Sequence, residues 1–109
     1  MTQVTEQNFS IAQFAAIKLQ TMEHILSVAS IVDVRTPNEF GQGHYPGAVN
    51  IPLNELPQRL HEFKEMKQPI VVYCLGGARS SAAVSILKQT GINEVYNGGG
   101  INDLLLFKK

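Results

Sequence analysis

Two short runs of apolar, largely β-branched residues constrain the fold of this chain more than any other feature of its sequence. They are "SIVDVR" (30–35) and "PIVVYC" (69–74). Neither run shows the strict alternation of apolar and polar residues that a half-exposed strand shows, so both indicate strands buried on two faces. Segments with helical periodicity lie before, between and after them. This alternation predicts an α/β protein in which helices cover both faces of a parallel sheet.

The remaining elements are expected from periodicity and from turn residues. They are a short strand near 15–17, helices over 21–28, 53–66, 80–90 and 101–109, brief strands at 49–52 and 93–97, a loop over 36–48 and a turn at 98–100. Asn54 is expected to cap the second of these helices, and Gly91 is expected to cap the end of the third. We expect residues 1–12 to form an N-terminal arm and residues 13–109 to form a single domain.

Composition and charge exclude several classes of protein. Nine basic and nine acidic residues cancel, which gives no support for a nucleic-acid partner or a membrane-surface partner. The apolar runs are far shorter than the roughly 20 residues of a membrane span, and the N-terminus lacks the pattern of a signal peptide. One cysteine excludes an internal disulfide, and three scattered histidines lack metal-ligand spacing. We therefore expect a cytoplasmic protein without a metal or another cofactor.

The single cysteine of the chain, Cys74, lies directly after the second apolar run, in the segment "YCLGGARSS" (73–81). In a parallel sheet with helices on both faces, ligands bind beyond the carboxyl ends of the strands. Asp33 and Arg35 end the first apolar run and are expected near the same edge. The sequence therefore predicts that Cys74 lies in the natural ligand-binding crevice of the fold.

Two features next to Cys74 could lower the pKa of its thiol, which is about 8.5 when nothing perturbs it. A helix is expected to begin at Ser80 or Ser81, and a helix N-terminus carries partial positive charge and free N–H groups. Gly76 and Gly77 allow successive backbone amides to turn inward around an anion.

Arg79 adds a permanent positive charge and a planar set of N–H donors to the same loop. Together with the amides it predicts a cradle for an anion, which can be a thiolate, a persulfide or a bound oxyanion. Taken alone, a lone cysteine is most often an inert buried residue, and a Gly-Gly pair is most often only a turn. The order of strand, cysteine, glycine pair, arginine and helix favours the reactive interpretation over the inert one.

Three segments, in this order along the chain, resemble the motifs of a known family. They are "IVDVRTPNEFGQGHYPGAVNIP" (31–52), "VVYCLGGARSS" (71–81) and "VYNGGGI" (95–101). The first contains Asp-x-Arg, Glu-Phe and Gly-His-x-Pro-Gly-Ala, the second contains Cys-x-x-Gly-x-Arg-Ser, and the third contains a glycine pair after the last strand. The chain thereby resembles the rhodanese homology domain, of the single-domain sulfurtransferase type, over about residues 13–107.

The resemblance implies a three-layer α/β/α fold around a parallel sheet of five strands. It implies that Cys74 is a catalytic nucleophile that alternates between thiolate and persulfide. The thiolate takes the outer sulfur of thiosulfate and releases sulfite, and the persulfide passes this sulfur to cyanide or to a thiol. Arg79 is implied to close the loop and attract the anion. The residues implied to hold the terminal sulfur through their backbone amides are Leu75, Gly76, Gly77, Ala78, Arg79 and Ser80.

Two other functions stay open. Related phosphatases and arsenate reductases share the fold, but their loop has one residue more between cysteine and arginine than the four present here. The shorter loop favours a sulfur substrate over a phosphate ester. Leu75 and Ala78 stand where many thiosulfate-active members carry basic residues, so the alternative is a partner-dependent sulfur relay or a non-catalytic binding module. The expected partners are a small sulfur-containing anion or a persulfide donor, and a thiol acceptor that can be a protein.

Asp33, Arg35 and His44 each allow two interpretations. Asp33 and Arg35 could support the Cys74 loop and tune its charge, or they could form a structural ion pair, and the second interpretation is favoured. His44 could act as a general base, but its place in a loop rich in glycine and proline favours hydrogen bonds to the backbone.

Overall fold

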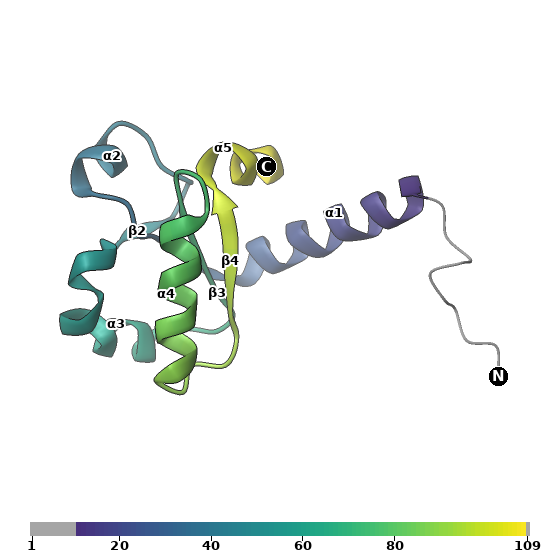
Figure 1. The fold of residues 1–109 in the computed structure, drawn as a ribbon. Coiled ribbons are helices and arrows are strands. Elements are labelled where there is room, and N and C mark those ends of the chain that lie inside the picture. Colours follow the sequence, from purple (N-terminus) through teal and green to yellow (C-terminus); the bar gives the residue numbers. More distant parts are fainter. Residues whose placement is uncertain (1–10, 109) are drawn as a thin grey trace.

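The computed structural model describes residues 11–108 of the 109-residue chain (Figure 1). The order of its elements is α1 (Ile11–Val28), β1 (Ser30–Asp33), α2 (Pro37–Gly41), β2 (Val49–Asn50), the 3-10 helix η2 (Leu53–Arg59), α3 (Leu60–Glu65), β3 (Ile70–Cys74), α4 (Ala78–Gln89), β4 (Val95–Gly100), α5 (Ile101–Leu104) and the 3-10 helix η3 (Leu105–Phe107). Residues 1–10, most of the expected N-terminal arm, lie outside the described residues. Among the described helices, none combines the length and the apolar character needed to cross a membrane.

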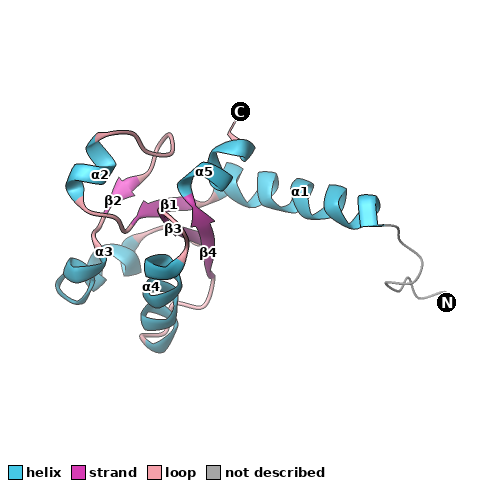
Figure 2. Cartoon of the chain, turned by 45° about the horizontal axis from the view of Figure 1, so that its top comes forward, coloured by secondary structure: helices cyan, strands magenta, loops and turns pink. Residues whose placement is uncertain are grey.

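Within residues 11–108, the sheet has four parallel strands in the order β2-β1-β3-β4, and every residue of β3 is buried. Successive side chains of β3 enter two separate apolar cores. Ile70, Val72 and Cys74 pack with residues of η2, α3 and α4, whereas Val71 and Tyr73 pack with residues of α1 and α5. Figure 2 shows these helices on the two sides of the sheet. The expected α/β fold, with a parallel sheet between helices, is confirmed.

The prediction of a fifth strand near 15–17 is wrong, because those residues belong to α1. No glycine or proline occurs within residues 11–28, and three of the first six residues are alanine, so nothing in this segment ends a helix. The helix expected at 21–28 is confirmed as the C-terminal part of α1, where Leu26 is buried in a core. The N-terminal part of α1 projects away from the sheet (Figures 1 and 2).

The segment 36–48 was expected to be a loop without regular structure, but it contains the short helix α2. Thr36 and Glu39 form a capping box at its start: the Thr36 hydroxyl accepts from Glu39 N–H at 3.2 Å, and Glu39 Oε1 accepts from Thr36 N–H at 3.0 Å. Pro37 occupies the first turn, where its missing N–H costs nothing. The segment "TPNE" contains the sequence pattern of a capping box, but the glycines and prolines around it favoured the prediction of a loop.

Two helix starts differ from those expected. The segment 53–59 forms a 3-10 helix, and its N-cap position is Pro52 rather than Asn54. Pro57 lies inside that helix and has no N–H to donate, which favours the later start of the regular helix α3. Helix α4 begins at Ala78, before the start expected at Ser80 or Ser81, because Gly77 closes the preceding loop with a φ of 101° that glycine adopts without strain.

Three further boundaries differ in the C-terminal part of the chain. The glycines at 98–100, expected as a turn, are part of β4, and the helix expected over 101–109 is divided into α5 and η3. Gly91 was expected to cap the end of α4, but the C-cap is Thr90, one residue earlier, and Gly91 follows it with a φ of 97°.

Candidate active site

Cys74 is the last residue of β3 and lies buried at the carboxyl edge of the sheet. Its Sγ atom accepts a hydrogen bond from Gly77 N–H at 2.9 Å and one from Ser80 N–H at 3.4 Å. The Ser80 hydroxyl oxygen lies 3.4 Å from the same sulfur. Donors from the start of α4 therefore converge on the thiol, as a cradle for an anion requires.

Asn97, in β4, holds this loop in place, and the sequence did not indicate it. Its Oδ1 accepts from the Ser80 hydroxyl at 2.7 Å and from Gly99 N–H at 2.8 Å, while its Nδ2 donates to the Gly77 carbonyl at 3.2 Å. The pairing of β3 with β4 skips Gly98, which is a local irregularity of the bulge type. No sequence pattern predicts this irregularity, so the contacts of Asn97 with the loop could not be inferred from the sequence.

The Ser80 hydroxyl has one hydrogen and three acceptors within reach. Its oxygen lies 2.7 Å from Asn97 Oδ1, 3.1 Å from the Gly77 carbonyl and 3.4 Å from Cys74 Sγ. The shortest distance places the hydrogen toward Asn97 while Cys74 is a thiol. A thiolate is a much stronger acceptor, so ionisation of Cys74 draws this hydrogen toward the sulfur.

The surroundings of Cys74 act in opposite directions on the pKa of its thiol. Burial raises the pKa, because it disfavours the charged thiolate. Hydrogen bonds from the Ser80 hydroxyl and from the N–H groups of Ser80, Gly77 and Gly76 lower the pKa, and together they outweigh burial. The net pKa therefore lies below that of an ordinary thiol, which is the direction that a nucleophilic cysteine needs.

Alkylation by iodoacetamide tests this lowered pKa, because the thiolate of Cys74 reacts and its thiol does not. The alkylation rate is expected to rise with pH, with its midpoint at a lower pH than that of free cysteine measured alongside. In Ser80→Ala the thiolate loses a donor, so the midpoint moves to higher pH. Ser85→Ala, at an exposed position of α4, is the matched control and leaves the midpoint unchanged. A wild-type midpoint at or above that of free cysteine would contradict the hydrogen-bond geometry.

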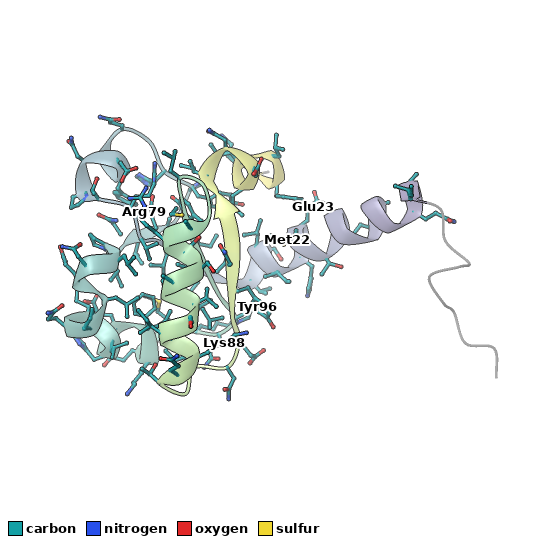
Figure 3. All side chains as sticks on the ribbon, viewed as in Figure 1. Met22, Glu23, Arg79, Lys88 and Tyr96 are labelled. Carbon is teal, nitrogen blue, oxygen red and sulfur yellow. The ribbon has the colours of Figure 1, made fainter. Side chains whose placement is uncertain are left out.

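The guanidinium of Arg79 is bonded to the carboxylate of Glu39 in α2. Nη1 donates to Oε1 at 2.7 Å and Nη2 donates to Oε2 at 3.0 Å. Figure 3 shows Arg79 near the start of α4, on the side that faces α2. The hydrogen bonds from Arg79, and then that from the Thr36 backbone, lower the pKa of Glu39 to about 2. The positive charge of the loop is thus paired with a carboxylate that the sequence did not single out as a site residue.

Asp33 and Arg35 form a buried ion pair at the carboxyl end of β1. Arg35 Nη2 lies 2.6 Å from Asp33 Oδ2, and the two side chains are 6% and 0% exposed. Arg35 also donates to the Gly43 carbonyl at 2.8 Å, and its guanidinium lies 5.7 Å from the centre of the Tyr73 ring. The Tyr73 hydroxyl in turn accepts from Tyr45 N–H at 2.9 Å. These contacts join the segment after α2 to the sheet.

His44 lies in the same segment, with its ring stacked on the ring of Phe40 at 3.8 Å. Its Nδ1 is 3.1 Å from the Phe40 carbonyl, which is a hydrogen bond to the backbone. His44 is one of the residues around a cleft of about 580 Å³ beside the Cys74 loop. Other residues that line this cleft are Arg35, Glu39, Leu75, Leu105 and Lys108. Within the described residues, no group of three or more His, Cys, Asp and Glu side chains could hold a metal ion.

The family model that describes the rhodanese-like domain matches residues 15–104. The chain belongs to this family. Within the rhodanese-like domain, each of the three motif segments contributes to one site: Glu39 from the first, residues 74–80 from the second and Asn97 from the third. The expected resemblance is confirmed, and its sheet of five strands is corrected to four described strands.

Relatives of this rhodanese-like domain include proteins named as sulfurtransferases. Uncharacterized protein YqhL of Bacillus subtilis (strain 168) is 46% identical over 69 residues, which are 63% of this chain and 54% of that protein. Thiosulfate sulfurtransferase PspE of Escherichia coli (strain K12) is 40% identical over 78 residues, which are 71% of this chain and 75% of that protein. A solved structure described as rhodanese with anions from E. coli matches with a TM-score of 0.64 at 36% identity, and covers 70% of this chain and 91% of that chain.

Proposed function

We propose that this protein is a sulfurtransferase that carries sulfane sulfur as a persulfide of Cys74. The observation that carries the proposal is the convergence of Gly77 N–H and Ser80 N–H on the Cys74 sulfur at the start of α4. These donors favour a thiolate, and they remain available to an anionic sulfur added to it. The name of the relative PspE supports sulfur chemistry of this kind. A chain with one cysteine and no internal disulfide fits a reducing compartment, and we propose that the activity lies in the cytoplasm.

The proposed reaction has two half-reactions. In the first, the Cys74 thiolate attacks the outer sulfur of thiosulfate, the S–S bond of thiosulfate breaks, and its electron pair leaves with sulfite. In the second, cyanide or a thiolate attacks the terminal sulfur of the persulfide, and the electron pair of the broken S–S bond returns to Cys74. The backbone N–H groups of 75–80 stabilise the negative charge on the terminal sulfur. Neither half-reaction requires a general base once Cys74 is a thiolate, which fits a His44 that bonds to the backbone.

A partner-dependent sulfur relay is the second candidate function, and two observations favour it. Leu75, directly after the cysteine, is 54% exposed and apolar. Ala78 is also exposed, and Arg79 is paired with Glu39, so little free positive charge faces a small dianion. A relay of this kind takes sulfur from a persulfidated partner and passes it to a thiol acceptor.

Steady-state kinetics with thiosulfate and cyanide distinguish the two candidates. The enzyme interpretation expects ping-pong kinetics for the wild type, and a loss of at least about 1,000-fold in Cys74→Ser, because no other side chain supplies the nucleophile. Ser85→Ala serves as a folded control with wild-type turnover. Turnover that survives in Cys74→Ser contradicts the persulfide mechanism. Negligible wild-type turnover with thiosulfate, together with transfer from a persulfidated protein, favours the relay.

A further inference from the structure

We infer that Glu39 determines donor specificity: by holding the guanidinium of Arg79, it selects sulfur donors with a single negative charge and an organic group over the dianion thiosulfate. This inference rests on the proposed sulfurtransferase function. It adds a residue and a class of donor that this function alone does not specify.

The pairing of Glu39 with Arg79 removes the free cation of the loop. Both terminal nitrogens of Arg79 donate to the two carboxylate oxygens, at 2.7 and 3.0 Å. This bidentate pair occupies the edge of the guanidinium formed by Nη1 and Nη2, which is one of the edges by which an arginine binds an oxyanion. An incoming dianion must therefore displace Glu39 or approach a pair whose net charge is zero.

Glu39 is held in this position from its other side as well. Its Oε1 accepts from the Thr36 backbone N–H at 3.0 Å and lies 3.1 Å from the Thr36 hydroxyl. The capping box of α2 thus fixes the carboxylate, so rotation away from Arg79 also breaks the cap of a helix. The pair is partly exposed, with 35% of the Arg79 side chain and 29% of the Glu39 side chain accessible, so its effect on an incoming anion is moderate.

The adjacent cleft has the character that a donor with an organic group requires. Leu75 and Leu105 present apolar surface to it, and they are 54% and 36% exposed. Two cations also line the cleft: the guanidinium of Arg35 is bonded to Asp33, and Lys108 is exposed, so solvent screens its charge. An apolar substituent on the donor can therefore contact leucine side chains, while its one negative charge is directed to the amides around Cys74.

Comparison of thiosulfate with methanethiosulfonate distinguishes the effect of the donor's charge and substituent from the effect of its sulfur chemistry. Each has an outer sulfur bound to a sulfonyl sulfur, and methanethiosulfonate has a methyl group where thiosulfate has a charged oxygen. The Cys74 thiolate takes the outer sulfur in both cases, and the electron pair of the broken S–S bond leaves with sulfite or with methanesulfinate. The persulfide product is identical, so a difference between the two donors reports how the site treats their charge and their substituent.

The test is the ratio of kcat/KM for thiosulfate to kcat/KM for methanethiosulfonate, with one acceptor thiol. Glu39→Gln keeps the side-chain oxygen that caps α2 but loses the charge, because glutamine also serves in a capping box. We expect this ratio to rise about 3- to 10-fold in Glu39→Gln, mainly through a lower KM for thiosulfate. Glu62→Gln is the matched control: it removes one carboxylate from a similar arginine pair, with Arg59 at 2.6 Å, and leaves the ratio unchanged. A ratio that stays constant or falls in Glu39→Gln overturns the inference.

A binding measurement separates failure of this inference from failure of the proposed function. Protection of Cys74 from iodoacetamide by sulfate, a dianion, and by methanesulfonate, a monoanion, requires no sulfur transfer. In Glu39→Gln the concentration of sulfate that gives half protection is expected to fall about threefold or more, with a smaller change for methanesulfonate. Equal changes for both anions, or none, overturn the role of Glu39. If neither donor loads the wild type while sulfate protection responds as expected, the proposed function fails and the role of Glu39 in anion selection stands.

Discussion

Replacement of Asp33 by alanine is expected to lower the free energy of unfolding by about 3–5 kcal/mol. Asp33 is fully buried and accepts from the Arg35 backbone N–H at 2.9 Å as well as from the Arg35 guanidinium. Without the carboxylate, a buried arginine keeps its charge and loses its partner, and desolvation of that charge is no longer offset. Urea unfolding of wild type and variant, followed by far-UV circular dichroism, measures the difference.

An exposed ion pair of the same chain provides the control for Asp33→Ala. Glu62 bonds to Arg59 at 2.6 Å, but both side chains are about one-third exposed, so Glu62→Ala is expected to cost less than about 1 kcal/mol. Asp33→Asn keeps an oxygen that can accept from Arg35, and its stability is expected to lie between wild type and Asp33→Ala. Equal costs for Asp33→Ala and Glu62→Ala would show that burial of the pair does not determine its contribution.

Replacement of Gly100 by alanine is expected to reduce sulfur transfer by about 100-fold, which is the scale of a 1 Å displacement of reacting groups. Gly100 ends β4 directly beside the Cys74 loop, where a Cβ atom would overlap the carbonyl oxygen of Leu75. This oxygen belongs to the backbone and cannot rotate away, so the loop itself has to shift. The shift moves Gly77 N–H and Ser80 N–H away from the Cys74 sulfur, and the pKa of the thiol is expected to rise. Turnover and the pH profile of alkylation measure both effects.

Gly41→Ala is the matched control for Gly100→Ala. Gly41 ends α2, and a Cβ atom built on it has no neighbour within 4 Å. This variant is expected to keep wild-type turnover and a wild-type alkylation midpoint. If Gly100→Ala also keeps both, the close approach of β4 to the loop does not position Cys74, and the description of the site needs revision.

The sequence predicted the parts of the fold that depend on local pattern. The apolar residues of β1 and β3 are buried on both faces of the sheet, as their sequence pattern predicted. A cysteine at the end of such a strand lies at the carboxyl edge of the sheet. The capping box of α2 was also local, but its letters lie among turn residues that favour a loop. The strand expected near 15–17 failed for a different reason: short apolar segments fit a strand or a helix equally well, and the lack of a helix stop decided the outcome.

The contacts that complete the site could not be predicted, because they join residues far apart in the chain. Glu39 and Arg79 are separated by 40 positions, and Ser80 and Asn97 by 17. Spacing in a sequence gives the residue types on a loop, but it does not give the partner from another element that satisfies each charge and hydroxyl. For this reason Arg79 was expected to attract a substrate anion, whereas in the structure its guanidinium is bonded to Glu39.

The most direct test of the proposed function is the intact mass of the protein after incubation with a sulfur donor and no acceptor. Thiosulfate and methanethiosulfonate are both used, so that a weak reaction with the dianion does not hide the capacity of Cys74. We expect the wild type to gain the mass of one sulfur atom, to lose it on addition of cyanide, and to show no gain in Cys74→Ser. No gain with either donor, or a gain that persists in Cys74→Ser, would contradict the assignment of Cys74 as the sulfur carrier.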